Sequence, residues 1–114
     1  MTNARVVTDA SFEAEVLKNP RPVIVEYWAE WCGPCRQVAP VLDSIAADSR
    51  GEVDLVTVNV DENPVIARRY GILAVPTVSI FVGGDVTKQV IGAKSKAAFL
   101  REFGDFLGRP APLP

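Results

Sequence analysis

The chain has 114 residues, of which 48% are hydrophobic and 23% charged, and its formal net charge is −2 at pH 7. These values are ordinary for one globular domain with its own core. They argue against nucleic-acid binding, because that needs a concentrated basic face. The absence of histidine excludes Ser–His and Cys–His catalytic pairs and histidine-ligated metals, and the two cysteines cannot by themselves complete a tetrahedral zinc site.

The first ten residues read MTNARVVTDA and lack the apolar run of a secretory signal peptide. No apolar run in the chain approaches the roughly 18 residues that cross a bilayer. We therefore expect a cytoplasmic protein without membrane segments, although the mature form of an imported protein would look the same.

The first part of the chain predicts a strand, a helix and a second strand. Residues 5–7 are apolar enough for a short strand, and the polar pair Thr8-Asp9 with Ser11 offers helix caps. Apolar residues at helical spacing then predict a helix of about ten residues. The prolines of residues 20–22 end it, and residues 23–28 form a nearly continuous apolar run, which is typical of a central strand covered on both faces.

The pattern changes after Cys32. Apolar residues then recur every three or four positions, which predicts a long helix up to about Ser49. Pro40 lies inside this helix and should kink it. Residues 53–60 predict the next strand.

The last part predicts a short helix, a hairpin and a final helix. Asn63-Pro64 begins the short helix and Gly71 ends it. Residues 77–82 and 87–91 are strands, and Gly83-Gly84-Asp85 between them suits a tight turn. The apolar side of the final helix comprises Phe99, Leu100, Phe103, Phe106 and Leu107. The complete order predicts a mixed sheet with helices on both faces, in one domain of residues 1–107 followed by a flexible tail of residues 108–114.

Both cysteines stand at the junction between a buried strand and the long helix, in Cys32-Gly33-Pro34-Cys35. Unpaired N–H groups and the dipole at a helix N-terminus favour an anion, so the pKa of the Cys32 thiol should fall toward neutrality. Cys35 lies about one helical turn further on, which lets the two sulfurs meet. Cys32 can then attack a partner disulfide, and Cys35 can attack Cys32 to release the reduced partner. A structural disulfide and a metal site are the alternatives.

A carboxylate interrupts the apolar strand at Glu26. Burial would raise the pKa of this carboxyl group, because desolvation disfavours the charged form. Glu26 could then accept the Cys35 proton near neutral pH. The alternative is a Glu26 side chain that faces the surface.

The motif WCGPC after a buried strand, with a single proline in Ala74-Val75-Pro76-Thr77, resembles the thioredoxin family. The resemblance runs from about Ala4 to Leu107. Further matching residues are Phe12, Pro40, Asn59-Val60-Asp61, Asn63-Pro64, Tyr70-Gly71, Gly84 and Gly92-Ala93. The resemblance implies an α/β thioredoxin fold, with a mixed central sheet of about five strands flanked by about four helices.

The resemblance also implies roles for individual residues. Cys32 would be the exposed attacking thiol, Cys35 the buried resolving thiol, and Glu26 the proton acceptor where the family usually has an aspartate. Thr57 stands where many members carry a lysine close to that carboxylate. A shallow apolar surface around Cys32 would bind substrate and would comprise Trp31, Gly33, Pro34, Ala74, Val75, Pro76, Ile91, Gly92 and Ala93.

Four positions near the site have structural roles in this resemblance. Pro76 would follow a cis peptide bond, with a proline at a strand start as the alternative. The backbone of Val75 could pair with an extended partner segment. Trp28 would pack beneath the site, which is compatible with a plain core role, and Pro40 would lie near it.

The implied activity is that of a protein-disulfide reductase, active in electron transport and cell redox homeostasis. Its redox-active disulfide would be Cys32–Cys35, with no bound cofactor. The implied partners are disulfide-containing client proteins and an NADPH- and flavin-dependent thioredoxin reductase, and we expect a monomer without nucleic-acid or membrane partners. A thiol oxidant or isomerase and a binding module are the alternatives. The Gly-Pro pair between the cysteines and the absence of a secretion signal favour the reductase.

Overall fold

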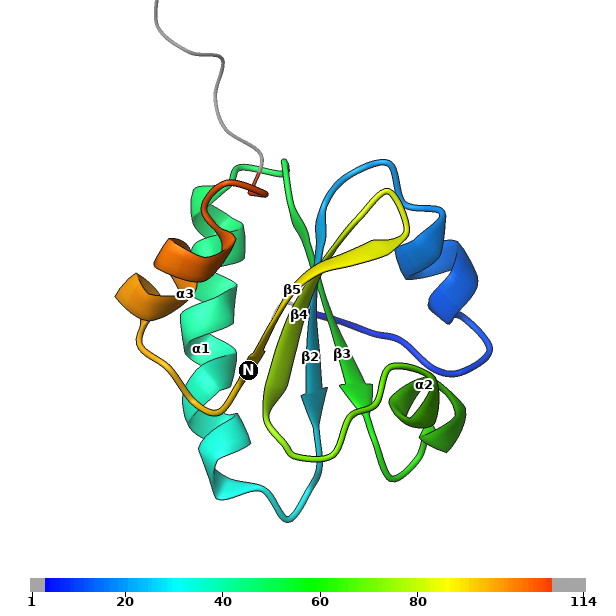
Figure 1. The fold of residues 1–114 in the computed structure, drawn as a ribbon. Coiled ribbons are helices and arrows are strands. Elements are labelled where there is room, and N and C mark those ends of the chain that lie inside the picture. Colours follow the sequence, from blue (N-terminus) through cyan, green and yellow to red (C-terminus); the bar gives the residue numbers. More distant parts are fainter. Residues whose placement is uncertain (1–3, 108–114) are drawn as a thin grey trace, which may run out of the picture.

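The structure is a computed structural model that describes residues 4–107 (Figure 1). Its elements in chain order are β1 (Arg5–Val6), the π-helix η1 (Glu13–Leu17), β2 (Val23–Trp28), α1 (Gly33–Asp48), β3 (Asp54–Asn59), α2 (Pro64–Arg69), β4 (Thr77–Val82), β5 (Asp85–Ile91) and α3 (Lys96–Phe103). The predicted order of strands and helices is confirmed. The flexible tail at 108–114 stays a prediction, because it lies outside the described residues.

The five strands form one mixed sheet in the order β1-β3-β2-β4-β5. β1 and β2 run parallel to β3, whereas β4 runs antiparallel to both β2 and β5. In Figure 1, α1 and α3 cover one face of this sheet, and η1 and α2 cover the other. β2 is therefore covered on both faces, which explains its nearly continuous apolar sequence.

Alternation along β2 divides its side chains between two cores. Val23, Val25 and Tyr27 enter the core beneath η1 and α2, whereas Ile24 enters the core beneath α1 and α3. Glu26 is two residues from Ile24 and therefore shares its face of the strand. Strand geometry thus directs the carboxylate toward α1, the helix that carries Cys35.

The first helix is shorter than predicted, with five residues instead of about ten. It is a single wide turn, in which the Lys18 N–H donates to the Glu13 C=O at 2.9 Å. The Asn19 side-chain amide donates to the Glu15 C=O at 3.1 Å, so a side chain occupies an acceptor that a longer helix would use. The predicted length was wrong because the spacing of apolar residues does not show that the Asn19 side chain ends the helix.

Asp9 caps a different helix from the one predicted. Its carboxylate accepts the N–H groups of Val65 and Ile66 at 3.2 and 2.9 Å, in the first turn of α2. Its own N–H donates to Asn63 Oδ1 at 2.8 Å. Asp9 therefore ties the segment between β1 and η1 to the start of α2, a contact between residues far apart in the sequence.

The hairpin and the final helix differ in detail from their predictions. β5 begins at Asp85, two residues early, because Gly83 and Gly84 alone make the turn, with φ of 61° and 87°. Positive φ at both positions is what a tight two-residue hairpin requires.

α3 buries Phe99 and Phe103, one turn apart, but leaves Leu100 at 40% exposure. The prediction for Leu100 was wrong because only a narrow stripe of α3 meets the sheet. Phe106 and Leu107 follow the helix and pack against the same core from a turn.

The hydroxyl of Tyr27 is the one buried side-chain polar atom of residues 4–107 without a hydrogen-bond partner. Burial, with a smaller contribution from Tyr70, raises the pKa of Tyr27 far above its usual range. Replacing Tyr27 by phenylalanine removes the unpaired hydroxyl and keeps the ring. We expect Tyr27→Phe to increase the free energy of unfolding by about 1 kcal/mol, measured by urea denaturation. Tyr27→Leu is the control that loses the ring, and a Tyr27→Phe protein less stable than the parent would contradict the prediction.

Candidate active site at the start of helix α1

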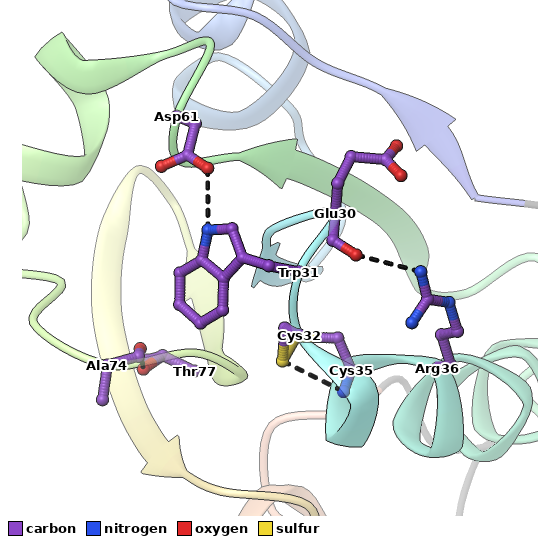
Figure 2. Close-up of a disulfide and its surroundings, with 8 residues drawn as sticks. All are labelled: Glu30, Trp31, Cys32, Cys35, Arg36, Asp61, Ala74 and Thr77. Atoms are coloured by element: carbon purple, nitrogen blue, oxygen red, sulfur yellow. Dashed lines mark hydrogen bonds between the residues drawn. A yellow bond between two sulfur atoms is a disulfide. The ribbon is translucent and has the colours of Figure 1, made fainter.

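The two cysteines are joined by a disulfide at the N-terminus of α1. Their Cα atoms are 5.4 Å apart, and Cys32 is the N-cap residue of the helix. The Cys35 N–H donates to Cys32 Sγ at 3.2 Å (Figure 2). One backbone donor and the positive end of the helix dipole therefore act on the Cys32 sulfur, which favours its thiolate when the bond is reduced. α1 continues through Pro40 to Asp48, and the kink at Pro40 stays a prediction.

Both cysteines are buried in the disulfide form. Cys32 is 3% exposed and Cys35 2%, so the expectation of an exposed Cys32 is wrong for this state. The reason is packing, since Trp28, Val60 and Val75 contact the cluster that the two cysteines form with Ala29. The contact of Trp28 with this cluster confirms its predicted place beneath the site.

The predicted substrate residues come from three segments at one end of the sheet. Trp31, Gly33, Pro34, Ala74, Ile91 and Ala93 are exposed, Val75 and Gly92 are half-buried, and Pro76 is buried. The Val75–Pro76 bond is cis, as predicted. The Gly92 N–H donates to the Pro76 C=O at 2.8 Å and joins two of the segments, while Val75 packs on the cysteine cluster.

Trp31 is held by a residue that sequence reasoning did not assign to the site. The indole Nε1–H of Trp31 donates to Asp61 Oδ2 at 2.9 Å (Figure 2), and Trp31 is 70% exposed. Asp61 follows β3, and its N–H donates to Asn59 Oδ1 at 2.9 Å, which fixes the turn. The contact spans 30 residues, so no local signal in the sequence could have shown it.

Glu26 is buried, with 3% exposure, which excludes the alternative of a surface-facing side chain. It pairs in register with Thr57 on β3 and Val78 on β4. Burial, with a smaller contribution from the negative charge of Asp43, raises the pKa of Glu26 to about 7. The carboxyl group can therefore both take up and release a proton near neutral pH.

A cavity of about 240 Å³ lies between this carboxyl group and Cys35. Its lining residues are Val6, Glu26, Trp28, Ala29, Cys35, Arg36, Ala39 and Thr57. Glu26 and Cys35 thus face one space, and the short Thr57 side chain forms part of its wall. The sequence pattern pointed to Glu26, and the family resemblance pointed to Thr57, but neither gave a sign of the cavity itself.

A Cys-x-x-Cys disulfide at a helix N-terminus, next to a buried carboxyl group whose pKa is raised to about 7, is typical of a thiol–disulfide oxidoreductase. The sequence profile of the Thioredoxin family matches residues 3–104. A thioredoxin of Streptomyces clavuligerus is 48% identical over 108 residues, which are 95% of this chain and 92% of that protein. Thioredoxin 1 of a Nostoc species is 51% identical over 96 residues, covering 84% of this chain and 90% of that protein.

The chain belongs to the thioredoxin family. It is a disulfide reductase of the thioredoxin type, and Cys32 and Cys35 are its redox pair. A "Bifunctional thioredoxin reductase/thioredoxin" of Mycobacterium leprae is also 48% identical over 99 residues, covering 87% of this chain and 22% of that protein. Within residues 4–107, no helix is both long and apolar enough to span a membrane.

Proposed function

We propose that the protein reduces disulfides of client proteins, with Cys32 as the attacking thiol and Cys35 as the resolving thiol. The observation that carries this assignment is the Cys35 N–H directed at Cys32 Sγ on the N-cap of α1. No donor from residues 4–107 reaches the Cys35 sulfur in this way, and Cys35 lines the same cavity as Glu26. The two sulfurs are therefore in unequal environments, one suited to a thiolate and the other to a thiol that gives up its proton later.

The proposed reaction has two displacements. The Cys32 thiolate attacks one client sulfur, an S–S bond forms between them, and the other client sulfur leaves and takes a proton. Cys35 then passes its proton to the Glu26 carboxylate and attacks Cys32 Sγ. The second client sulfur leaves as a thiolate, so the client gains two electrons and the protein keeps the Cys32–Cys35 disulfide.

The client segment would lie on the apolar surface around Cys32. Val75 precedes β4 and belongs to no strand, so its peptide groups have no ladder partner in the described part of the chain. An extended client segment can pair with them, as segments do when they add to a sheet. A Cβ at Gly33 would meet nothing within 4 Å, which leaves room for the client sulfur to approach.

We further propose that an NADPH- and flavin-dependent thioredoxin reductase reduces the disulfide again. Support comes from the relative named as a bifunctional thioredoxin reductase/thioredoxin, part of which aligns with this chain. A cytoplasmic location fits this cycle, because a disulfide reductase must work where thiols are kept reduced.

The proposal is tested by titrating the Cys32/Cys35 pair against thiol–disulfide buffers and following the fluorescence of Trp28 and Trp31. We expect a reversible two-electron transition below the glutathione poise of about −220 to −260 mV. The Cys35→Ser protein is the control, in which this transition should vanish. A midpoint well above that range would favour an oxidant or isomerase, and the lack of any reversible transition would favour a binding module.

A further inference from the structure

A groove of about 500 Å³ lies between β5 and α3, and we call it the basic groove. Its residues include Val90, Ile91, Lys94, Ala98, Arg101 and Glu102. β5 is the last strand of the sheet, so the groove lies at the edge of the sheet that no further described strand covers.

The basic groove is continuous with the surface around Cys32. Ile91, which is 61% exposed, belongs both to the groove and to the predicted substrate surface. The Lys94 Cε and Nζ atoms lie 3.8 and 3.9 Å from the position that a Cβ would take on Gly92. The Lys94 ammonium group therefore folds back over the segment that follows β5 and reaches the rim of the substrate surface.

The charges in the basic groove do not cancel. Glu102 is paired with Lys88 at 3.7 Å, so its charge is matched from β5. Lys94 and Arg101 are both exposed, and neither makes an ion pair within residues 4–107. Two positive charges without an ion-pair partner in residues 4–107 thus line a groove that reaches the substrate surface, in a protein whose net charge is −2.

The opposite side of the site carries a negative charge. Asp61 follows β3, and β3 lies on the other side of β2 from β4 and β5. Its carboxylate is held against the exposed Trp31 ring. A client segment crossing the site would therefore meet a carboxylate at one end and two cations at the other.

We propose that the basic groove receives acidic residues that lie on one side of the target cysteine in a client protein. The inference rests on the proposed function, because it names which client disulfides this site reduces fastest. Exposed charges of this kind act mainly on the rate of association and depend on salt. Asp61 repels the same acidic residues when they lie on the other side of the cysteine, so the preference has a direction along the client chain.

The test uses three short peptides with a single cysteine, each oxidised to its symmetric disulfide dimer. One carries two glutamates before the cysteine, one carries them after it, and one has glutamines at all these positions. The reduced protein is mixed with each peptide at low ionic strength, and its oxidation is followed by tryptophan fluorescence. We expect one of the two acidic peptides to react about 3- to 10-fold faster than the neutral one. Added salt should remove the difference.

Two variants assign this preference to the groove. In the double variant Lys94→Gln/Arg101→Gln, the acidic peptide that the parent protein prefers should react no faster than the neutral one. The other acidic peptide should stay slow, because Asp61 is unchanged. The matched control is Arg68→Gln/Arg69→Gln, which removes the same charge from exposed positions on α2, on the other face of the sheet. It should keep the preference. The charge-reversed variant Lys94→Glu/Arg101→Glu should react more slowly with the peptide that the parent protein prefers than with the neutral peptide. A loss of folding would slow all three reactions and would not reverse this order.

The outcomes separate the inference from the proposed function. Equal rates for all three peptides with the parent protein would overturn the inference and leave the reductase intact. Equal loss of the preference in the Arg68/Arg69 variant would also overturn the inference. The preference would then come from the net charge of the protein and not from the basic groove. If none of the three peptides oxidised the reduced protein, the proposed function would be overturned together with the inference.

Discussion

Replacing Cys35 by serine should trap the protein on its client. Cys32 keeps its place at the N-cap of α1 and can still attack a disulfide, but no second sulfur remains to release it. We expect turnover below about 0.1% of the parent activity, together with a covalent complex through Cys32. Mass spectrometry of the reaction mixture, before and after dithiothreitol, would show the complex and its loss.

The companion variant Cys32→Ser decides the order of the two thiols. It should be equally inactive but should form no complex, because Cys35 lacks the N-cap position and the backbone N–H donor that favour a thiolate at Cys32. A complex formed by Cys32→Ser and not by Cys35→Ser would reverse the proposed roles. Complexes of equal yield with both variants would mean that the environment of the two sulfurs does not choose between them.

The variant Glu26→Gln should slow the release of the client while leaving the first attack nearly unchanged. The buried amide fills the same space but cannot take the Cys35 proton. In the parent protein we expect the rate of release to rise as the pH passes about 7, where the carboxyl group loses its proton. Glu26→Gln should lose this rise and release the client about 100-fold more slowly at neutral pH.

Stopped-flow experiments can separate the two steps, because mixed-disulfide formation and client release occur one after the other. Glu26→Asp is the matched control, since it keeps a carboxyl group and shortens the side chain by one methylene. It should retain the pH dependence with a smaller loss of rate. Equal loss in both steps for Glu26→Gln, and likewise for Glu26→Ala, would contradict a role in proton transfer.

The same residue should make stability depend on pH. The pKa of Glu26 is about 7 in the folded protein and 4.5 for a free glutamate, so the folded state binds the proton more tightly. The contribution of this group to stability is then fully present below pH 4.5 and is lost as the pH rises through about 7, by about 3 kcal/mol. In urea unfolding of the oxidised protein, Glu26→Gln should lack this decline and be the more stable protein at pH 8.

Much of the fold could be predicted because the apolar residues recur at the regular spacing of strands and helices. The apolar run of residues 23–28 predicted a strand covered on both faces, and the strand is indeed central. The same run made Glu26 conspicuous, because a charge there must either face away from the core or be buried. The Cys-Gly-Pro-Cys spacing placed the sulfurs on the first turn of a helix that proved to begin at Gly33.

The remaining features depend on contacts between distant segments. Apolar spacing could not show that α3 ends at Phe103 and leaves Leu100 exposed, since packing against β5 and α1 decides which stripe is buried. Asp61 reaches Trp31 only after β3 has paired with β2. The burial of Cys32 likewise follows from the neighbouring Trp28 and Val75, which the cysteine motif does not specify.

The hydrogen bonds between Asp9 and α2 couple the local unfolding of the segment before η1 to that of α2. α2 has six residues, too few to persist as a helix by itself. Its first amides depend on Asp9, so detachment of the segment ahead of η1 exposes them to hydrogen exchange. The loop ahead of α2 carries Asp61, the residue that holds Trp31. Fluctuations at the N-terminal side of the sheet can therefore loosen the tryptophan that borders the redox disulfide, without any change at the disulfide itself.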